Sequence, residues 1–118
     1  MNVKLLQNRT KQFHIAVIKL CEEMPRNAAG FAIAKQLIRS AGSVGANYRA
    51  TARAKSKADF INKIEIVLEE ADESHYWLEV IRDAGLKQGE LVEKLIIEAN
   101  ELTAIFAATD KTIKAKYR

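Results

Sequence analysis

Residues 60–81 read FINKIEIVLEEADESHYWLEVI, and the spacing within this stretch decides the fold class. Its apolar and small residues alternate at intervals of four and three: Phe60, Ile64, Val67, Ala71, Ser74, Leu78 and Ile81. Such spacing places them on one face of an α-helix, as a seam of the coiled-coil kind. Ser56 and Asp59 suit a helix start, and Gly85 suits a helix end. The stretch therefore predicts a helix over about 57–84.

Three further segments, at about 9–24, 28–54 and 88–114, show helical periodicity. Pro25 ends the first, and Asn27 can cap the second by accepting a free N–H of its first turn. The seam predicted for the second segment is Phe31, Ala34, Ile38, Ala41, Gly45, Tyr48 and Ala52. Short connections between long helices favour antiparallel neighbours. We therefore predict a single all-α domain over residues 1–118, an antiparallel up-down-up-down four-helix bundle with left-handed packing.

Composition and motifs argue against several classes of protein. The single cysteine, Cys21, cannot form an internal disulfide, which favours a cytoplasmic location. No export signal and no run of about 18 apolar residues is present, so we expect no membrane segment. No catalytic triad order, phosphate-binding glycine loop or dinucleotide fingerprint occurs. The pair Asp72 and His75 is too little for a carboxylate-bridged metal site. We expect no enzyme activity, no cofactor and no metal.

Charge is segregated along the chain, although the net charge is only +4. From residue 25 to residue 58 there are seven basic residues and no acidic one. From residue 59 to residue 83 there are eight acidic residues against two basic ones. The contrast has two explanations. The charges pair across the second and third helices or between subunits, or the basic segment binds a phosphate backbone.

The basic residues of the second helix form a stripe beside the predicted seam, with Gly42 and Ala46 at its centre. Because the centre has no bulky side chain, a phosphate backbone or another helix can approach closely. The candidate nucleic-acid-binding residues are Lys35, Arg39, Arg49, Arg53, Lys55 and Lys57. Aromatic residues make up only 7% of the chain, so recognition of base identity is not expected.

Small polar residues lie along another side of the second helix, where alanine or leucine would be better helix formers. Together with two glutamates of the third helix they form a predicted structural polar cluster: Ser40, Ser43, Asn47, Glu69 and Glu73. We expect the small groups to permit close helix contact and to bond Glu69 or Glu73. A ligand site is the alternative. Trp77 is expected in the core or at a subunit interface.

Five motifs, taken in order, resemble one known family. They are RSAGSVGANYRA at 39–50, KADF at 57–60, EEADES at 69–74, YWL at 76–78 and NELTAIF at 100–106. Their order and spacing are similar to those of the four-helix bundle family called 23S rRNA intervening-sequence proteins. Members are bacterial, and their molecular activity is generally unassigned. The resemblance implies a homopentameric ring. It also implies kinship with the accessory variability determinant of diversity-generating retroelements, a basic, pentameric nucleic-acid binder associated with a reverse transcriptase.

These observations predict a non-enzymatic oligomeric scaffold that presents a basic surface to RNA or DNA, alone or with a protein partner. The alternative is a structural or protein-interaction module whose charges serve its own oligomer interface. Apolar residues outside the predicted seams, namely Ile33, Leu37 and Ile66, support oligomerisation. The two hypotheses differ in whether carboxylates of the third helix cover the basic stripe.

Overall fold

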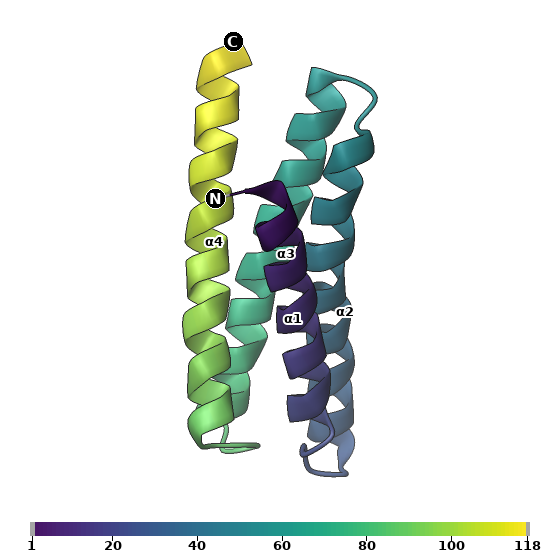
Figure 1. The fold of residues 1–118 in the computed structure, drawn as a ribbon. Coiled ribbons are helices and arrows are strands. Elements are labelled where there is room, and N and C mark those ends of the chain that lie inside the picture. The colour runs from purple at the N-terminus through teal and green to yellow at the C-terminus, as the bar shows by residue number, and fades with distance from the viewer. Residues whose placement is uncertain (1, 118) are drawn as a thin grey trace.

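Four long helices account for most of the computed structural model, which describes residues 2–117. They are α1 (Val3–Cys21), α2 (Ala28–Ala50), α3 (Lys57–Asp83) and α4 (Glu90–Tyr117), with a 3-10 turn, η1 (Thr51–Arg53), after α2. In Figure 1 the chain turns back at each connection, so the helices lie alongside one another. The resulting bundle measures 46 × 22 × 21 Å. The predicted all-α four-helix fold is confirmed, and the handedness of its packing stays a prediction.

The first helix is longer than the sequence pattern indicated. It begins at Val3 rather than near Arg9, because the side chain of Asn2 accepts the backbone N–H of Leu5 at 2.7 Å and caps the helix. The added turns bury Leu6, and the fully buried Thr10 hydroxyl donates to the Leu6 carbonyl at 3.0 Å. The polar threonine is thus satisfied inside its own helix.

The ends of α2 and α3 follow the predicted chemistry. The side chain of Asn27 accepts the N–H of Gly30 at 2.9 Å, and the Ser56 hydroxyl accepts the N–H of Asp59 at 3.0 Å. Gly85 follows α3 with φ of +71°, a left-handed conformation that glycine adopts without strain. The next N–H, of Leu86, reaches back to the Ile81 carbonyl at 3.0 Å. These bonds fix where the connections begin.

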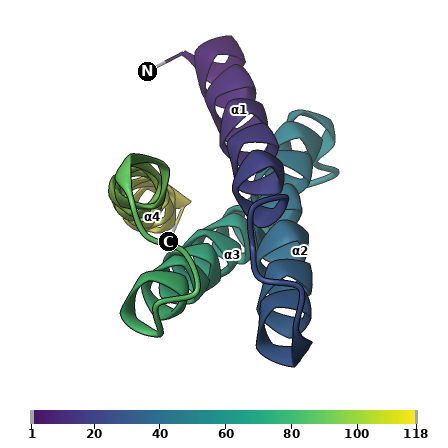
Figure 2. The same cartoon turned by 90° about the horizontal axis from the view of Figure 1, so that it is seen from below.

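Each helix contributes one face to a shared apolar core. Its largest fully buried side chains include Val17, Leu20, Leu37, Val44, Ile64, Val67, Leu78, Ile81, Val92, Leu102 and Phe106. Viewed along the bundle in Figure 2, α2 lies between α1 and α3, and α4 lies beside α3. Helices adjacent in sequence pack extensively, whereas α1 and α4 contact each other over less of their length.

The seam predicted for the second helix is wrong at both ends. Phe31 is 61% exposed and Ala52 is also exposed, whereas Ala41 and Tyr48 are buried as predicted. The face that enters the core carries Leu37, Ser40 and Val44 as well. Because Leu37 fills the core of its own chain, it no longer supports oligomerisation.

Candidate nucleic-acid interface

Arg39 is the candidate residue that pairs with carboxylates of α3, although its side chain is 49% exposed. One guanidinium nitrogen donates to Glu70 at 2.7 Å, and another pairs with Glu73. The hydrogen bonds that Arg39 donates to Glu70 and then to Glu73 raise the pKa of Arg39 above its ordinary value. Glu73 also accepts the indole N–H of Trp77 at 3.0 Å, and this bond, followed by that of Arg39, lowers the pKa of Glu73. Arg39 therefore joins α2 to α3, as the structural alternative expects.

The other five candidate residues, Lys35, Arg49, Arg53, Lys55 and Lys57, are likewise exposed. In the described part of the chain, Lys35, Arg49, Arg53 and Lys55 form no side-chain ion pair within 4.0 Å. Arg49 lies near the end of α2, Arg53 in η1, and Lys55 and Lys57 around the start of α3. The structure therefore gathers four of the five at one end of the bundle, and Lys35 lies farther along α2.

A groove of about 470 Å³ runs between α1 and α2 and includes Arg49. The α1 side supplies Lys4, Gln7, Asn8, Lys11 and His14, and the α2 side supplies Gly42, Gly45, Ala46 and Arg49. The stripe centre predicted from the sequence, Gly42 and Ala46, thus lies in the groove. A Cβ added at Gly45 would lie 3.5 Å from the Thr10 carbonyl oxygen, so the two helix backbones pass close together here.

The electrostatics of this groove favour an anion. None of its nine described lining residues is acidic, and Lys4, Lys11 and Arg49 are exposed. Among the residues that the structure describes, no carboxylate pairs with these three. An ammonium or guanidinium without a protein partner retains its full capacity to bind phosphate oxygens.

The prediction from sequence missed the α1 half of this groove. Lys4, Gln7, Lys11 and His14 recur at intervals of three and four, so they share a helix face. That signal was available, but the predicted helix began after Lys4. Which face of α1 lies against α2 depends on packing in three dimensions.

Charge segregation extends over the two halves of the chain. Residues 1–58 hold eleven basic and two acidic residues, a net charge of +9, while residues 59–118 hold eight basic and thirteen acidic residues, a net charge of −5. Several carboxylates of the second half are already paired. Asp59 binds Lys63 at 2.7 Å, Glu65 and Asp110 bind Lys114, and Glu98 and Glu101 bind Arg9. The helical pair α1 and α2 is therefore the cationic side of the molecule.

The predicted polar cluster forms with different partners. Ser40 is fully buried and shares a 2.8 Å hydrogen bond with Ser74 of α3, while its hydroxyl also lies 3.2 Å from the Leu37 carbonyl. The amide of Asn47 donates to the Ser43 hydroxyl at 2.8 Å.

The prediction that the small polar residues of α2 bond Glu69 or Glu73 is therefore wrong. Within residues 2–117, neither Glu69 nor Glu73 bonds Ser40, Ser43 or Asn47. Glu73 is instead bound by Arg39 and Trp77. The buried hydroxyl pair serves the contact between α2 and α3.

Other reactive groups lie outside the groove. Burial raises the pKa of the Cys21 thiol to about 11, which keeps it protonated and poorly nucleophilic near neutral pH. The Nδ1 atom of His75 lies 3.8 Å from a carboxylate oxygen of Glu79. No cluster of three potential metal ligands occurs within residues 2–117. In the same range, no helix combines the length and apolarity that crossing a bilayer requires.

Comparisons with known proteins find a family model and a solved structure that are similar to this chain. Residues 5–108 match the family model described as 23S rRNA-intervening sequence protein. A solved structure from Bacteroides thetaiotaomicron, a protein of unknown function from the S23 ribosomal protein family, has 31% sequence identity and a TM-score of 0.84. The alignment covers 94% of this chain and 99% of that one. A comparison with curated proteins finds no match.

Proposed function

This chain belongs to the 23S rRNA-intervening sequence protein family, and we propose that it is a non-enzymatic, self-assembling scaffold that binds the phosphate backbone of RNA or DNA. The contact surface is the groove between α1 and α2. Binding occurs alone or together with a protein partner.

The observation that carries the proposal is the composition of the groove. Three exposed cationic side chains, from Lys4, Lys11 and Arg49, surround a floor of glycine and alanine. The small floor residues let a sugar-phosphate backbone approach the helices, and the long side chains on both walls can reach its oxygens. Because phosphate contacts carry no sequence information, we expect affinity without base specificity at this groove.

The surface outside the groove extends the same charge. Arg53 and Lys55 follow Arg49 in sequence and are exposed at the same end of the bundle. A strand that leaves the groove past Arg49 therefore meets further cations. Each phosphate that they neutralise releases condensed counterions, so affinity should depend steeply on salt.

Self-assembly would bring several of these basic grooves together in one oligomer. Phe31 and Ile97 are each 61% exposed, and Ile33 and Ile66 are half-buried, which leaves apolar surface for contact between copies. The family resemblance implies a ring of five. Several grooves in one ring would bind one nucleic acid more tightly than any single groove.

The second candidate function, a protein-interaction module, is favoured by one observation. Arg39 is bound to two carboxylates of its own chain and is not available to phosphate without breaking those contacts. We therefore assign Arg39 to the helix interface and leave the binding role to the groove. The exposed basic residues of the groove are not assigned to a helix interface.

The deciding experiment is an electrophoretic titration of 23S rRNA fragments and duplex DNA at about 50 and about 200 mM salt. The test variant is Lys11→Gln with Arg49→Gln. The control is Lys19→Gln with Lys94→Gln, which removes the same charge from residues paired with nearby glutamates. We expect the groove variant alone to bind more weakly and to lower the log–log salt slope by about one unit per residue.

Two further variants separate charge from shape. Ala46→Leu fills the exposed groove floor without altering charge, and we expect it to weaken binding. Arg39→Gln should leave binding unchanged. If the wild type binds neither nucleic acid at about 50 mM salt, where phosphate contacts are strong, the protein-interaction function replaces this proposal.

A further inference from the structure

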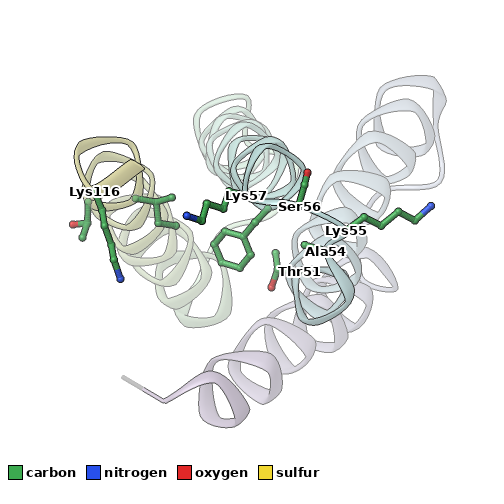
Figure 3. Close-up of a pocket in the computed structure, with 9 residues that line it drawn as sticks. Thr51, Ala54, Lys55, Ser56, Lys57 and Lys116 are labelled. Atoms are coloured by element: carbon green, nitrogen blue, oxygen red, sulfur yellow. The ribbon is translucent and has the colours of Figure 1, made fainter. Parts of the chain in front are cut away.

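A cavity of about 590 Å³ lies where the α2–α3 connection meets α4, and its basic residues are not free to bind an anion. Lys57 and Lys116 each have an interaction of their own. Figure 3 shows Lys57 extending from α3 toward α4, whereas Lys55 points away from the cavity. The groove between α1 and α2 is therefore the cavity whose cationic side chains are available to a ligand.

This groove contains one more group that can become cationic, the imidazole of His14. The ring lies over the groove floor, because a Cβ added at Gly42 would meet the Cε1 and Nε2 atoms of His14 at 3.0 Å. A side chain at position 42 would compete with the imidazole for this space, and glycine leaves it open. Since His14 is partly buried, the two helices hold part of its ring and the rest lines the groove.

The ring nitrogens of His14 are available to a ligand. Within residues 2–117, neither nitrogen forms a hydrogen bond, and no carboxylate oxygen lies within 4.0 Å of one. In the same range, the buried side-chain nitrogen or oxygen atom that lacks a partner is Oδ1 of Asp110. The imidazole nitrogens are therefore not sealed away from the groove.

His14 continues a row of basic residues along the groove. The backbone N of Lys11 lies 3.7 Å from the position of a Cβ at Gly45, and His14 lies against Gly42, one helical turn away. Arg49 lies one turn beyond Gly45 in the other direction. A strand that occupies the groove therefore meets Arg49, Lys11 and His14 in that order.

The nearby charged groups on the other packed helices are paired or basic. On the α4 side of α1, Glu98 and Glu101 bind Arg9 at 2.6 and 2.8 Å. On α2, Arg39 is paired with carboxylates of α3, and Lys35 is exposed. No described carboxylate is thus placed to neutralise a charge on His14, so an anion that enters the groove can do so.

We propose that His14 is a proton-linked phosphate ligand, so that the groove takes up a proton when it binds a nucleic-acid strand and binds more tightly in mild acid. The inference deepens the proposed function and rests on it. Imidazole is the side chain whose ordinary charge change falls between about pH 5 and about pH 8. The charged ring donates from both nitrogens, whereas the neutral ring donates from one. A phosphate beside the ring favours the charged form, and by linkage the charged form favours phosphate.

The probe is an oligouridine RNA without terminal phosphates, because neither its bases nor its phosphodiesters change charge in mild acid. Affinity and the log–log salt slope are measured at about pH 7.2 and about pH 5.5, where carboxylates of ordinary pKa, about 4, remain ionised. The test variants are His14→Gln, which cannot become charged, and His14→Lys, which is always charged. The control is His75→Gln, which removes the other histidine of the chain, beside Glu79 on α3.

We expect the wild type and His75→Gln to bind about fivefold more tightly at the lower pH, with a salt slope steeper by about half a unit, because one more cation faces the phosphates. His14→Gln should lose this change and keep the weaker affinity. His14→Lys should also lose it but keep the steeper slope. Calorimetry in two buffers of different ionisation enthalpy should detect proton uptake on binding by the wild type and none by His14→Gln.

The outcomes separate this inference from the proposed function. If the wild type binds the RNA equally at both pH values, or if His14→Gln retains the pH response, the inference is overturned and the groove binds through its permanent cations. If His14→Gln fails to fold by circular dichroism, a pH response that persists in His14→Lys overturns the inference. If the RNA does not bind at either pH or at any salt concentration, the proposed function itself fails.

Discussion

At the scale of single residues, two glycines of α2 have opposite surroundings. A Cβ at Gly30 would lie 2.0 Å from the carbonyl oxygen of Pro25, which real atoms cannot tolerate. A Cβ at Gly45 would meet the Thr10 carbonyl oxygen at 3.5 Å, an ordinary contact. The turn before α2 therefore requires glycine at position 30, whereas the surroundings of Gly45 have room for a Cβ.

This contrast predicts opposite effects of one substitution. Gly30→Ala should lower the free energy of unfolding by about 1–3 kcal/mol, because the turn must shift to admit the methyl group. Gly45→Ala should be neutral or raise it by up to about 1 kcal/mol, because alanine is the better helix former. Urea unfolding followed by circular dichroism measures both. Equal stability of the two variants would show that the turn at Pro25 relaxes without cost.

At the scale of helices, α2 and α3 are joined by two kinds of polar contact. The buried hydroxyls of Ser40 and Ser74 bond in the core, and Arg39 binds Glu70 and Glu73 at the surface. Trp77 adds its indole N–H to Glu73. Since Glu73 must be ionised to accept all these bonds, the contact depends on pH.

The folded protein holds the pKa of Glu73 below its ordinary value, chiefly through Trp77 and then through Arg39. This contribution to stability is present above the ordinary glutamate pKa of about 4.3 and is lost as pH falls through the lowered value. Trp77→Phe removes the indole donor, so its free energy of unfolding should fall less than that of the wild type between about pH 5.5 and about pH 3.

Unfolding must be followed by circular dichroism, because Trp77 is the only tryptophan. Tyr76→Phe is the matched control, since Tyr76 is an exposed aromatic neighbour, and it should keep the wild-type pH dependence. Identical slopes for the wild type and Trp77→Phe would show that the indole bond does not set the pKa of Glu73.

How well sequence predicted each helix depended on its residues. In α3 the predicted seam is buried from Ile64 to Ile81, and only Phe60 at its start is partly exposed. In α2, alanines and glycines occur on all sides, so spacing alone did not distinguish the face with Leu37 from the face with Phe31. The place of Ser40 in the core is recognisable only when its partner hydroxyl, Ser74 of α3, is known.

At the scale of the whole molecule, the site depends on pairs of helices. The basic residues of α2 were predictable from composition, but the groove needs Lys4 and Lys11 of α1 beside them. The ion pairs of Arg39 likewise need α3. Single-helix patterns contain no information on which faces meet, so the predicted stripe and the observed groove share Arg49, Gly42 and Ala46 only.

Sedimentation tests the proposed assembly. The chain has a mass of 13.2 kDa and exposes Phe31 and Ile97. We expect a species several times this mass at micromolar concentration, and Phe31→Ser with Ile97→Ser should shift it toward smaller species without loss of helicity. A stable wild-type monomer would contradict self-assembly and leave each groove to bind alone.

The packing of each helix on its sequence neighbour also bears on how fast the chain finds its structure. Contacts between neighbours close short loops, so little chain entropy is lost before packing begins. The contact between α1 and α4 is the exception, since Arg9 and Glu98 are 89 residues apart. Helical bundles dominated by local contacts fold in microseconds to milliseconds. We expect helices adjacent in sequence to pair on that timescale, and the salt bridge between Arg9 and Glu98 to form last.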